Sequence, residues 1–441
     1  MELETKIEKI YDLLKRRSIH DFEIYGTDSD TIRAESKEGA MGSLSKSKES
    51  GIGVRLIIDG AMGFAYGAEP TTELVDAAVT SARYQFKDQN NHLPPRQEGY
   101  EEIDILDSAL GRLAAEDCIE RAVCLERSAR DADSRVHQVR KASFSRTVSR
   151  VSIMNSHGID ASAGLSVASA SVMVVAKHED DSQSGYEFDF SHHVRDIDVE
   201  KIGRRAALRA TEMLHARKMR TTKIPVLFDN TATAQMLDFI SDAFVGENVI
   251  KEKSFIADKI GRTYFSDVVR LTDNPLDKRA ADASPFDGEG VRSRETVLVD
   301  NGTILAFVYD SYWGRVAGTS STGSSLRGGY RAMPISGVRH LCLERGTEDM
   351  VQNLKGLKRI LKITDIMGMH TANPITGEFS VGVSGLLMEE GAPLYPVREA
   401  AISGNIYELF SRVMAVGTDI REFGDVLCPS VLIDAVDVSA Q

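Results

Sequence analysis

One order of elements occurs twice in the first half of this chain, and it constrains the fold more than any single motif does. Apolar residues spaced three or four positions apart in residues 3–14 predict an amphipathic helix. Short β-like runs follow, and a second helix is predicted from about Thr71. The same order of helix, strands and helix recurs between Ala114 and Ala216. We therefore expect two related α/β units produced by internal duplication.

Each unit is predicted to place several strands between its two helices. In the first unit the runs are Phe22–Tyr25, Thr31–Ala34, Val54–Ile58 and Ala61–Tyr66, with a tight hairpin at Asp59-Gly60. In the second unit the runs are Ser143–Met154, Ser166–Ala176 and Tyr186–Val194, followed by a helix at Val199–Ala216. Residues 88–99 are polar and contain proline, which is typical of a linker. We place an N-terminal α/β domain at residues 1–105 and a central α/β domain at residues 106–218.

The remaining part, residues 222–441, has a different pattern. Ile224–Phe228 predicts a strand, and Thr231 is predicted to cap the helix that follows. Thr296–Tyr309 contains two β-rich runs around Asn301-Gly302, which is typical of a type I′ hairpin. Further helices are expected near Met350–Leu361 and Asn405–Val416. We predict a β-rich C-terminal domain with peripheral helices, and an α+β fold class for the whole chain.

Charge and composition exclude several classes of protein. Fifty-three Lys and Arg against 66 Asp and Glu give a net charge of −13, which disfavours general binding to nucleic acid. The sequence contains no stretch of about 18 apolar residues, which is the length needed to span a membrane. Residues 1–17 are rich in charge and do not form a signal peptide. The four cysteines form no CxxC pair, which favours a reducing compartment. We expect a soluble cytoplasmic protein with no nucleic-acid or membrane partner.

Three glycine-rich segments resemble known catalytic or phosphate-binding loops, and each lacks a residue that the chemistry needs. Gly318–Ser325 has Ser324 in place of the lysine of a phosphate-binding loop. Residues 51–53 begin like a dinucleotide loop, but Leu56 stands at its third glycine position. Residues 382–385 resemble a nucleophile elbow whose final glycine is replaced by Leu386.

A zinc motif is also incomplete. The segment His178–Asp181 begins like HExxH, but Ser182 stands at the second histidine position, and we interpret it as a solvated turn. His192 and His193 are adjacent, so on a strand they point to opposite faces. Cys118 and Cys124 do not share a helix face. His370 lies in a glycine-flanked segment that could line a cleft. The residues by themselves show no complete catalytic constellation.

An ordered set of motifs in the C-terminal part resembles the TldD/PmbA family, whose members were once called modulators of DNA gyrase. The motifs are Pro285–Val291 leading into the Asn301-Gly302 hairpin, Ser320–Gly323, Gly368–Gly382 and Pro429–Asp434. The resemblance extends over essentially the full length, and it implies an N-terminal domain, a similar central domain and a β-rich C-terminal domain. In this family, two paralogous subunits form a heterodimeric zinc metalloprotease that acts on unfolded or flexible peptides. The TldD subunit carries an HExxxH helix and a downstream cysteine, whereas the PmbA (TldE) subunit lacks them.

This chain departs from the catalytic pattern. The corresponding helix, Leu237–Glu247, contains no histidine, and the carboxylates Asp242 and Glu247 alone are poor zinc ligands. Cys428 is not at the place expected for the family's cysteine. The resemblance is therefore to the PmbA/TldE side, and we expect neither a catalytic residue nor a metal ligand in this chain. Zinc is expected in a TldD-like partner subunit, and the dimer is either with that partner or with a second copy.

The resemblance also implies that this subunit closes a chamber that excludes folded proteins, and that it helps to hold an extended peptide there, for instance by strand addition. The residues expected at such a cleft are His370, Asn373, Gly377, Glu378, Phe379 and Ser380. The alternative for this glycine-rich loop is that it only packs the C-terminal domain. Two other functions stay open: a self-sufficient homodimeric peptidase with a site built from His370, Asp242 and Glu247, and a regulatory protein that binds gyrase.

Overall fold

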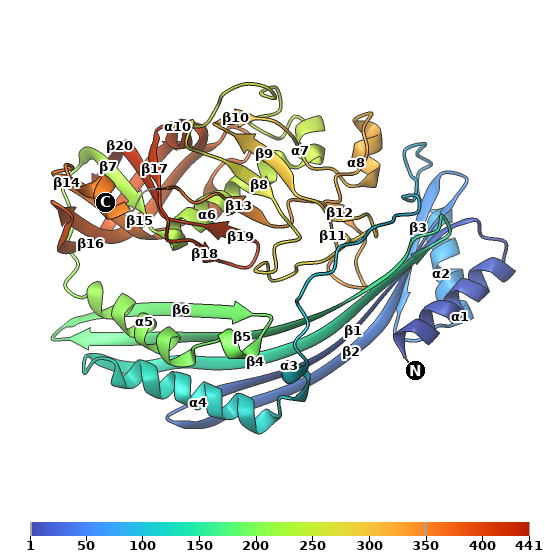
Figure 1. Ribbon diagram of the computed structural model, residues 1–441, viewed down its shortest axis with the longest axis horizontal. Helices are drawn as coiled ribbons and strands as arrows, with labels where there is room; N and C mark the ends of the chain where they lie inside the picture. Colours follow the sequence, from blue (N-terminus) through green and yellow to red (C-terminus); the bar gives the residue numbers. More distant parts are fainter. Residues whose placement is uncertain (1, 348–349, 441) are drawn as a thin grey trace.

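The first two parts of the chain share one antiparallel sheet, whose strand order is β3-β2-β1-β4-β5-β6 (Figure 1). The computed structural model describes residues 2–347 and 350–440. The strands of this sheet are β1 (Asp21–Lys37), β2 (Ala40–Ile58), β3 (Ala61–Gly67), β4 (Val136–Asn155), β5 (Asp160–His178) and β6 (Asp181–Ser191). β1 and β4 pair at the centre, from Glu23 opposite Asn155 to Ser36 opposite Ala142. The two units are therefore joined edge to edge.

Helices of both units pack against this sheet, and α4 of the second unit also covers part of β1 of the first unit. The helices are α1 (Leu3–Arg16), α2 (Thr72–Arg83), α3 (Ser108–Arg112), α4 (Ala115–Asp131) and α5 (Val199–Glu212), with a short 3-10 helix η1 (Val194–Asp196). The same close approach occurs twice. A Cβ on Gly63 of β3 would lie 2.2 Å from the Ala78 carbonyl oxygen of α2, and a Cβ on Gly185 of β6 would lie 2.2 Å from that of Ala206 in α5. These equivalent contacts confirm two related units.

The predicted strands of the first two units lie at the right places, but most are too short, and the run Tyr186–Val194 extends past β6, which ends at Ser191. Phe22–Tyr25 and Thr31–Ala34 belong to the single strand β1, because residues between them pair with β2 on one side and β4 on the other. The Asp59-Gly60 hairpin is present, with positive φ at both residues. Polar residues interrupt the apolar pattern of a strand without interrupting its backbone hydrogen bonds.

The C-terminal domain contains two further six-stranded sheets and a two-stranded one. The first, in the order β16-β15-β14-β7-β20-β17, closes through pairing of β16 with β20; the second has the order β10-β9-β8-β13-β19-β18, and β11 pairs with β12. Its strands are β7 (Thr222–Phe228), β8 (Leu271–Asp273), β9 (Thr296–Asp300), β10 (Thr303–Ile304), β11 (Ser325–Leu326), β12 (Ile335–Ser336), β13 (Leu341–Leu343), β14 (Arg359–Met367), β15 (Glu378–Glu389), β16 (Ala392–Asn405), β17 (Val413–Val416), β18 (Arg421–Glu422), β19 (Val426–Cys428) and β20 (Val431–Ala440). The α+β fold class with a β-rich C-terminal domain is confirmed.

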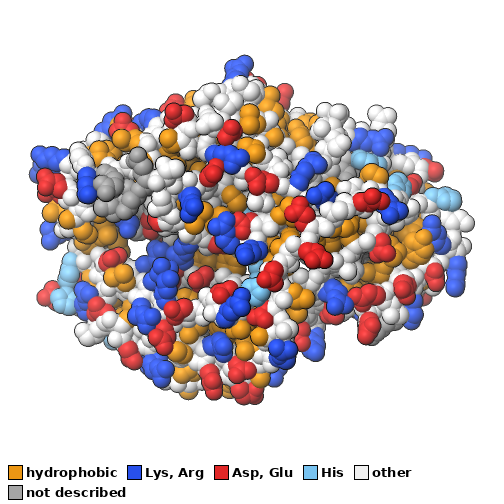
Figure 2. All heavy atoms as spheres, in the orientation of Figure 1, with side chains coloured by type: hydrophobic (Ala, Val, Ile, Leu, Met, Phe, Trp, Pro, Cys, Tyr) orange, Lys and Arg blue, Asp and Glu red, His pale blue; other side chains and the backbone are white. Residues whose placement is uncertain are grey.

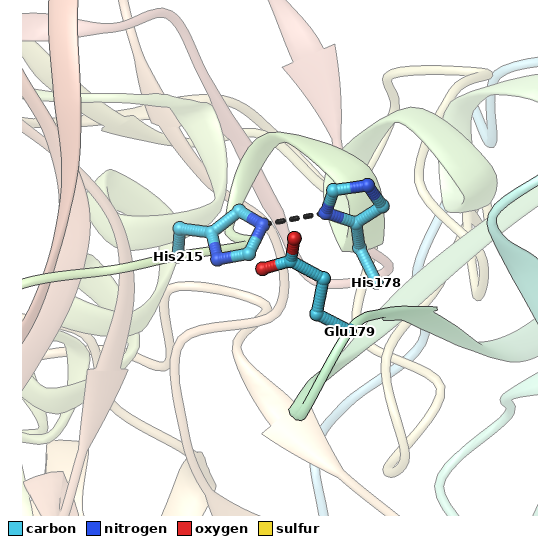
Figure 3. A group of neighbouring side chains, drawn as sticks. All are labelled: His178, Glu179 and His215. Carbon is cyan, nitrogen blue, oxygen red and sulfur yellow. Dashed lines mark hydrogen bonds between the residues drawn. The ribbon is translucent and has the colours of Figure 1, made fainter.

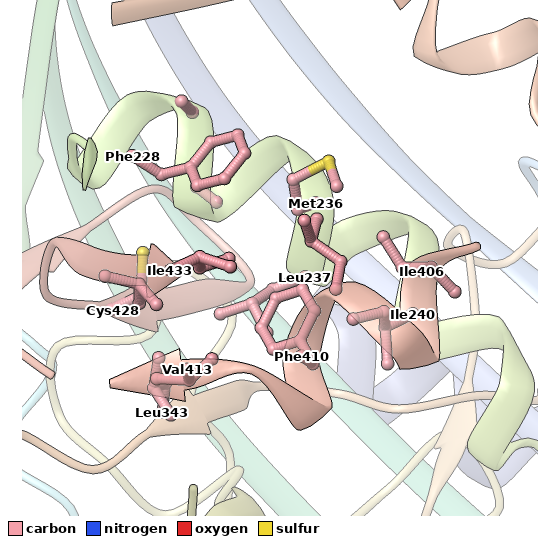
Figure 4. Packing of buried hydrophobic residues seen from close by; sticks show 14 of the residues in the cluster. Phe228, Met236, Leu237, Ile240, Leu343, Ile406, Phe410, Val413, Cys428 and Ile433 are labelled. Carbon is pink, nitrogen blue, oxygen red and sulfur yellow. The ribbon is translucent and has the colours of Figure 1, made fainter. Parts of the chain in front are cut away.

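Short helices accompany these sheets. They are α6 (Asn230–Ser241), η2 (Asp242–Phe244), α7 (Gly246–Ile250), α8 (Ser311–Val316), α9 (Met350–Leu354), η3 (Met369–Thr371) and α10 (Ile406–Ser411). Helix α6 is central to the core of this domain: Met236, Leu237 and Ile240 pack among Phe228, Phe410 and residues of β20 (Figure 4). Within the described part of the chain, no helix is long and apolar enough to cross a membrane.

Four details of the C-terminal prediction need correction. Asp229, rather than Thr231, caps α6, because its carboxylate accepts a hydrogen bond from the Ala232 N–H. The Asn301-Gly302 hairpin is present, with φ of 45° and 72°, but its second strand ends at Ile304. The two later helices are shorter than predicted: α9 ends at Leu354 before β14, and α10 ends at Ser411 before β17. After α9 the chain turns at Gly356, which has φ of 119°, before β14 pairs with β7; after α10, β17 pairs with β20 instead of continuing the helix.

The C-terminal domain contacts the first two units at several places, and buried ion pairs hold it at opposite ends of the long sheet. Near β1 and β2, Arg55 pairs with Glu289, and Arg327 pairs with Glu23. At the other end, Glu187 of β6 accepts hydrogen bonds from Arg421 of β18. Figure 1 shows the sheet bending beneath the C-terminal domain between these ends.

Candidate functional site

The segment Leu237–Glu247 runs from the last turn of α6 through η2 into α7. Its apolar side chains face the core, whereas Asp238 and Asp242 reach solvent. Partial burial raises the pKa of both aspartates, and the negative charges of Asp425 and Asp242 raise that of Asp238 further. Glu247 is paired with Lys251, whose Nζ lies 2.6 Å from its Oε1. Asp238 and Asp242 therefore hold a proton more readily than usual, and the charge of Glu247 is balanced by Lys251. Both conditions disfavour binding of a metal ion.

Cys428 lies against the other end of α6. Its Sγ is 3.4 Å from the carbonyl oxygen of Asn230, and the side chain is fully buried. Burial raises the pKa of this thiol well above its usual value, and the charges of Glu422 and Asp229 act in the same direction. Zinc is bound by thiolate, imidazole and carboxylate. A protonated thiol and carboxyls with raised pKa, with no histidine in residues 230–250, do not fit the zinc site of a peptidase.

The residues predicted to contact a peptide lie at the start of β15 and in the loop before it. The Asn373 N–H donates to the Glu378 carbonyl, and the Gly377 N–H donates to the Asn373 carbonyl, so the loop is closed on itself. His370, on η3, is exposed, as are Asn373, Glu378 and Ser380, whereas Phe379 is 5% exposed and belongs to the core. β15 pairs with β14 on one edge and β16 on the other. The role of these residues in peptide binding stays a prediction.

A site built from His370, Asp242 and Glu247 does not form in this arrangement. Among residues 2–347 and 350–440, two groups bring three possible metal ligands within 4.8 Å of one another, and neither contains any of these three residues. One group is His178, Glu179 and His215; the other is Asp277, His340 and Cys342.

The first group lies where the second unit meets the C-terminal domain (Figure 3). His178 ends β5, Glu179 begins the turn to β6, and His215 follows α5. The Nδ1 atom of His178 lies 2.7 Å from the Nε2 atom of His215. The residues around His178 do form an exposed turn, as the sequence predicts. The second histidine comes from a distant part of the chain, which a search for HExxH cannot find.

The second group is buried and already holds positive charge. His340 Nε2 lies 2.9 Å from Glu422 Oε2, and its Nδ1 lies 3.3 Å from Cys342 Sγ. Burial opposes a charged imidazole, but these two hydrogen bonds and the charges behind them raise the pKa of His340 to about 11. Arg279 is paired with Asp277 through two nitrogen atoms. A divalent ion would have to displace the positive charges of His340 and Arg279, so we interpret this group as structural.

Three family models match the chain in order. The PmbA/TldA metallopeptidase domain 1 matches residues 22–83, the central domain matches residues 109–214, and the C-terminal domain matches residues 221–440. The chain belongs to the PmbA/TldD family. This confirms the resemblance that the ordered C-terminal motifs indicate.

Individual relatives of the PmbA/TldD family match over nearly the whole chain. A protein of Haemophilus influenzae named metalloprotease PmbA homolog is 26% identical over 435 residues, which is 92% of this chain and 94% of that protein. The fold is similar to that of a Thermotoga maritima protein whose name refers to modulation of DNA gyrase, with a TM-score of 0.91, 24% identity and coverage of 99% and 100% of the two chains. TldE from Thermococcus kodakarensis has a TM-score of 0.91 at 23% identity, with coverage of 98% and 100%.

Several chemically interesting residues of this PmbA/TldD chain were missed from the sequence. His215, His340, Cys342 and Glu422 gain their possible roles only from neighbours that are distant in the chain. For His340 and Cys342 a local signal existed, because residues i and i+2 of a strand point to the same face. No local signal marks His215.

Proposed function

We propose that this chain is the PmbA/TldE-type, non-catalytic subunit of a cytoplasmic zinc metalloprotease that degrades or processes unfolded or flexible peptides. A TldD-like subunit would supply the metal ligands and the general base. The observation that carries the proposal is the donor set at α6. In residues 230–250 there is neither histidine nor cysteine, and the nearby Cys428 thiol is buried with a raised pKa.

The arrangement of the chain supports a role as a wall of a shared chamber. The C-terminal domain is held on the long sheet by buried ion pairs at Arg55–Glu289 and by Glu187–Arg421 at the far end. Two separate attachments resist hinge motion between the domains better than one. A rigid wall of this kind would exclude folded proteins while admitting an extended chain.

Peptide contact would come from side chains instead of strand addition to β15. β15 is paired with β16 from Glu378 to Glu389 and with β14 from Gly382 to Glu389, so few of its backbone groups are free to pair with a peptide. The exposed side chains His370, Asn373, Glu378 and Ser380 are the groups available in this region. They would bind a peptide weakly and with little preference for its sequence.

The experiment compares the purified chain with a complex co-expressed with a TldD-type subunit. Unfolded casein is the substrate, and a stably folded protein of similar size is the control substrate. We expect no cleavage by the chain alone, cleavage of casein by the complex, and loss of that activity after chelation. Chelator-sensitive casein cleavage by this chain alone would contradict the proposal, as would a TldD-type subunit whose activity is the same without this chain.

A further inference from the structure

Three side chains of the types that bind transition metals converge outside the α6 region. The ligand atoms of His178, Glu179 and His215 all lie within 4.8 Å of one another. Figure 3 shows the two imidazoles facing each other with the carboxylate beside them. Two imidazoles and one carboxylate are a ligand set that zinc uses in proteins. All three residues are exposed, so an ion could reach them directly from solvent.

The backbone holds two of these residues in unusual conformations. Glu179 has φ of 53° and His215 has φ of 61°, both in the left-handed region that non-glycine residues seldom occupy. The His215 N–H donates to Asp181 Oδ2 at 2.6 Å, which ties the linker after α5 to the β5–β6 turn. The imidazole of His215 is thereby presented towards the turn that carries the other two ligands.

Charge and space at this position also suit a cation. Within the described residues Glu179 forms no ion pair, and Asp180 and Asp181 follow it directly in the turn. A solvent-open cavity of about 450 Å³ is lined by Glu179, Asp180, Asp181, His215, Ala216 and Arg398. One arginine faces three carboxylates there, so negative charge remains to be balanced, and the cavity has room for water on the ion.

We propose that Nδ1 of His178, Nε2 of His215 and a carboxylate oxygen of Glu179 bind one divalent transition-metal ion of the zinc and cobalt class, with water at the remaining position. Two nitrogens on one tetrahedral ion are about 3.3 Å apart when each metal–nitrogen bond is about 2.0 Å. The observed separation is 2.7 Å. A small rotation of the two exposed imidazole rings would therefore bring the nitrogens to the separation that a bound ion requires.

The ion would act as a clamp between domains. His178 and Glu179 belong to the second unit, whereas the linker that carries His215 continues into pairing with β16 of the C-terminal domain. There the Arg217 N–H donates to the Pro396 carbonyl at 2.9 Å. Metal bound to the turn and to this linker joins the two domains at a point that neither attachment described above covers. The inference does not depend on the proposed peptidase role.

Cobalt(II) is the probe, titrated into the chelator-treated full chain. We expect one equivalent to bind with visible d–d absorption. Second-shell changes alone weaken metal binding by about 10–100-fold, so His178→Ala and His215→Ala should each weaken it by at least about tenfold. His137→Ala, at another exposed histidine, is the matched control and should bind as the unmodified chain does. Because all three histidines are exposed, folding should be unaffected, and circular dichroism checks this.

Other outcomes overturn the proposal. Absence of a one-equivalent complex, or unchanged affinity in both alanine variants, would do so. A sulfur-to-cobalt charge-transfer band that disappears in Cys342→Ser would instead place the ion in the buried group.

Thermal unfolding tests the clamp separately: zinc should raise the midpoint of thermal unfolding of the unmodified chain but not of His215→Ala. An equal rise in both would refute the clamp. Casein cleavage is not a readout here, so failure of this proposal and failure of the proposed function are distinguishable.

Discussion

The Nη1 atom of Arg55 lies 2.9 Å from Oε1 of Glu289, and each of these side chains is only 3% exposed. The pair joins β2 of the first unit to the C-terminal domain across 234 positions of sequence. Glu23 and Arg327 complete the network, and the charges of Glu23 and Glu289 overcome desolvation and raise the pKa of Arg55. Alternating positive and negative groups allow four ionised side chains to stay inside the protein.

Removing the central cation should be costly. Arg55→Met keeps a side chain of similar length, but it leaves Glu289 without its ion-pair partner and Glu23 paired with Arg327 alone. Loss of one partner from a buried ion pair typically costs about 3–5 kcal/mol. We expect a decrease of that size in the free energy of unfolding, measured by chemical denaturation. Arg16→Met, at an exposed position of α1, is the control and should change it by less than about 0.5 kcal/mol. Similar effects of the two changes would contradict this role of Arg55.

Asp310 predicts a specific dependence of stability on pH. Burial, followed by repulsion from Glu289, raises its pKa from 3.8 to about 7. Between these values the folded state binds more protons than the unfolded state, so the free energy of unfolding falls as the pH rises through this window. Asp310→Asn removes the charge, and asparagine can still accept the capping hydrogen bond from the Trp313 N–H.

We therefore expect Asp310→Asn to be more stable than the unmodified chain at pH 8, by up to about 4 kcal/mol. The difference should shrink as the pH is lowered towards 4. Thermal unfolding followed from pH 4 to pH 8 measures it. A variant that is less stable at pH 8, or a difference that does not change with pH, would show that the Asp310 charge is not the cause.

The two equivalent glycines should respond alike to substitution. In Gly63→Ala and Gly185→Ala the new Cβ would lie 2.2 Å from a helix carbonyl oxygen, so the helix must move away from the sheet. Overpacking of this kind costs about 1–3 kcal/mol. Gly111→Ala is the control, because nothing lies within 4 Å of its Cβ position, and in a helix this change should stabilise by about 0.5–1 kcal/mol. Differential scanning calorimetry of the three variants decides whether the helix–sheet approach is as close as the structure places it.

Substitutions near α6 test the proposed non-catalytic role directly. If the partner subunit supplies the metal site, Asp242→Asn and Glu247→Gln should leave casein cleavage by the assembled complex within about twofold. The reason is that neither side chain belongs to a ligand group among the described residues. The measurement is kcat/KM at saturating partner. A loss of about a hundredfold or more in either variant, with assembly intact, would show that this chain contributes catalytic residues.

Much of the fold could be predicted because its signals are local. The helical spacing of α1 and α5, the hairpin at Asp59-Gly60 and the turn at Asn301-Gly302 depend on residues a few positions apart. The full length of β1 was missed, because its polar middle is held by partners on both sides. The end of α10 was misplaced for a related reason, because β17 pairs with the distant β20 directly after it, whereas α9 ends at a turn in which Gly356 has φ of 119°.

The candidate sites depended far more on tertiary structure. The incomplete motif at His178 could be seen, but its partner His215 is 37 positions away and joins it only through the packing of α5. The absence of histidine and cysteine from residues 230–250, in contrast, is a property of the residues themselves and needed no structure. A sequence can therefore exclude a site that requires particular side chains more securely than it can find one assembled from separate segments.

The central position of β1 has a consequence during synthesis. A nascent chain that ends with the first unit displays one side of β1, from Glu23 to Ser36, without the strand that covers it in the finished protein. Bare strand edges recruit foreign strands and promote aggregation. This edge of β1 is covered only when β4 has left the ribosome. Any delay in translating the second unit therefore prolongs the time during which the edge can pair with a foreign strand.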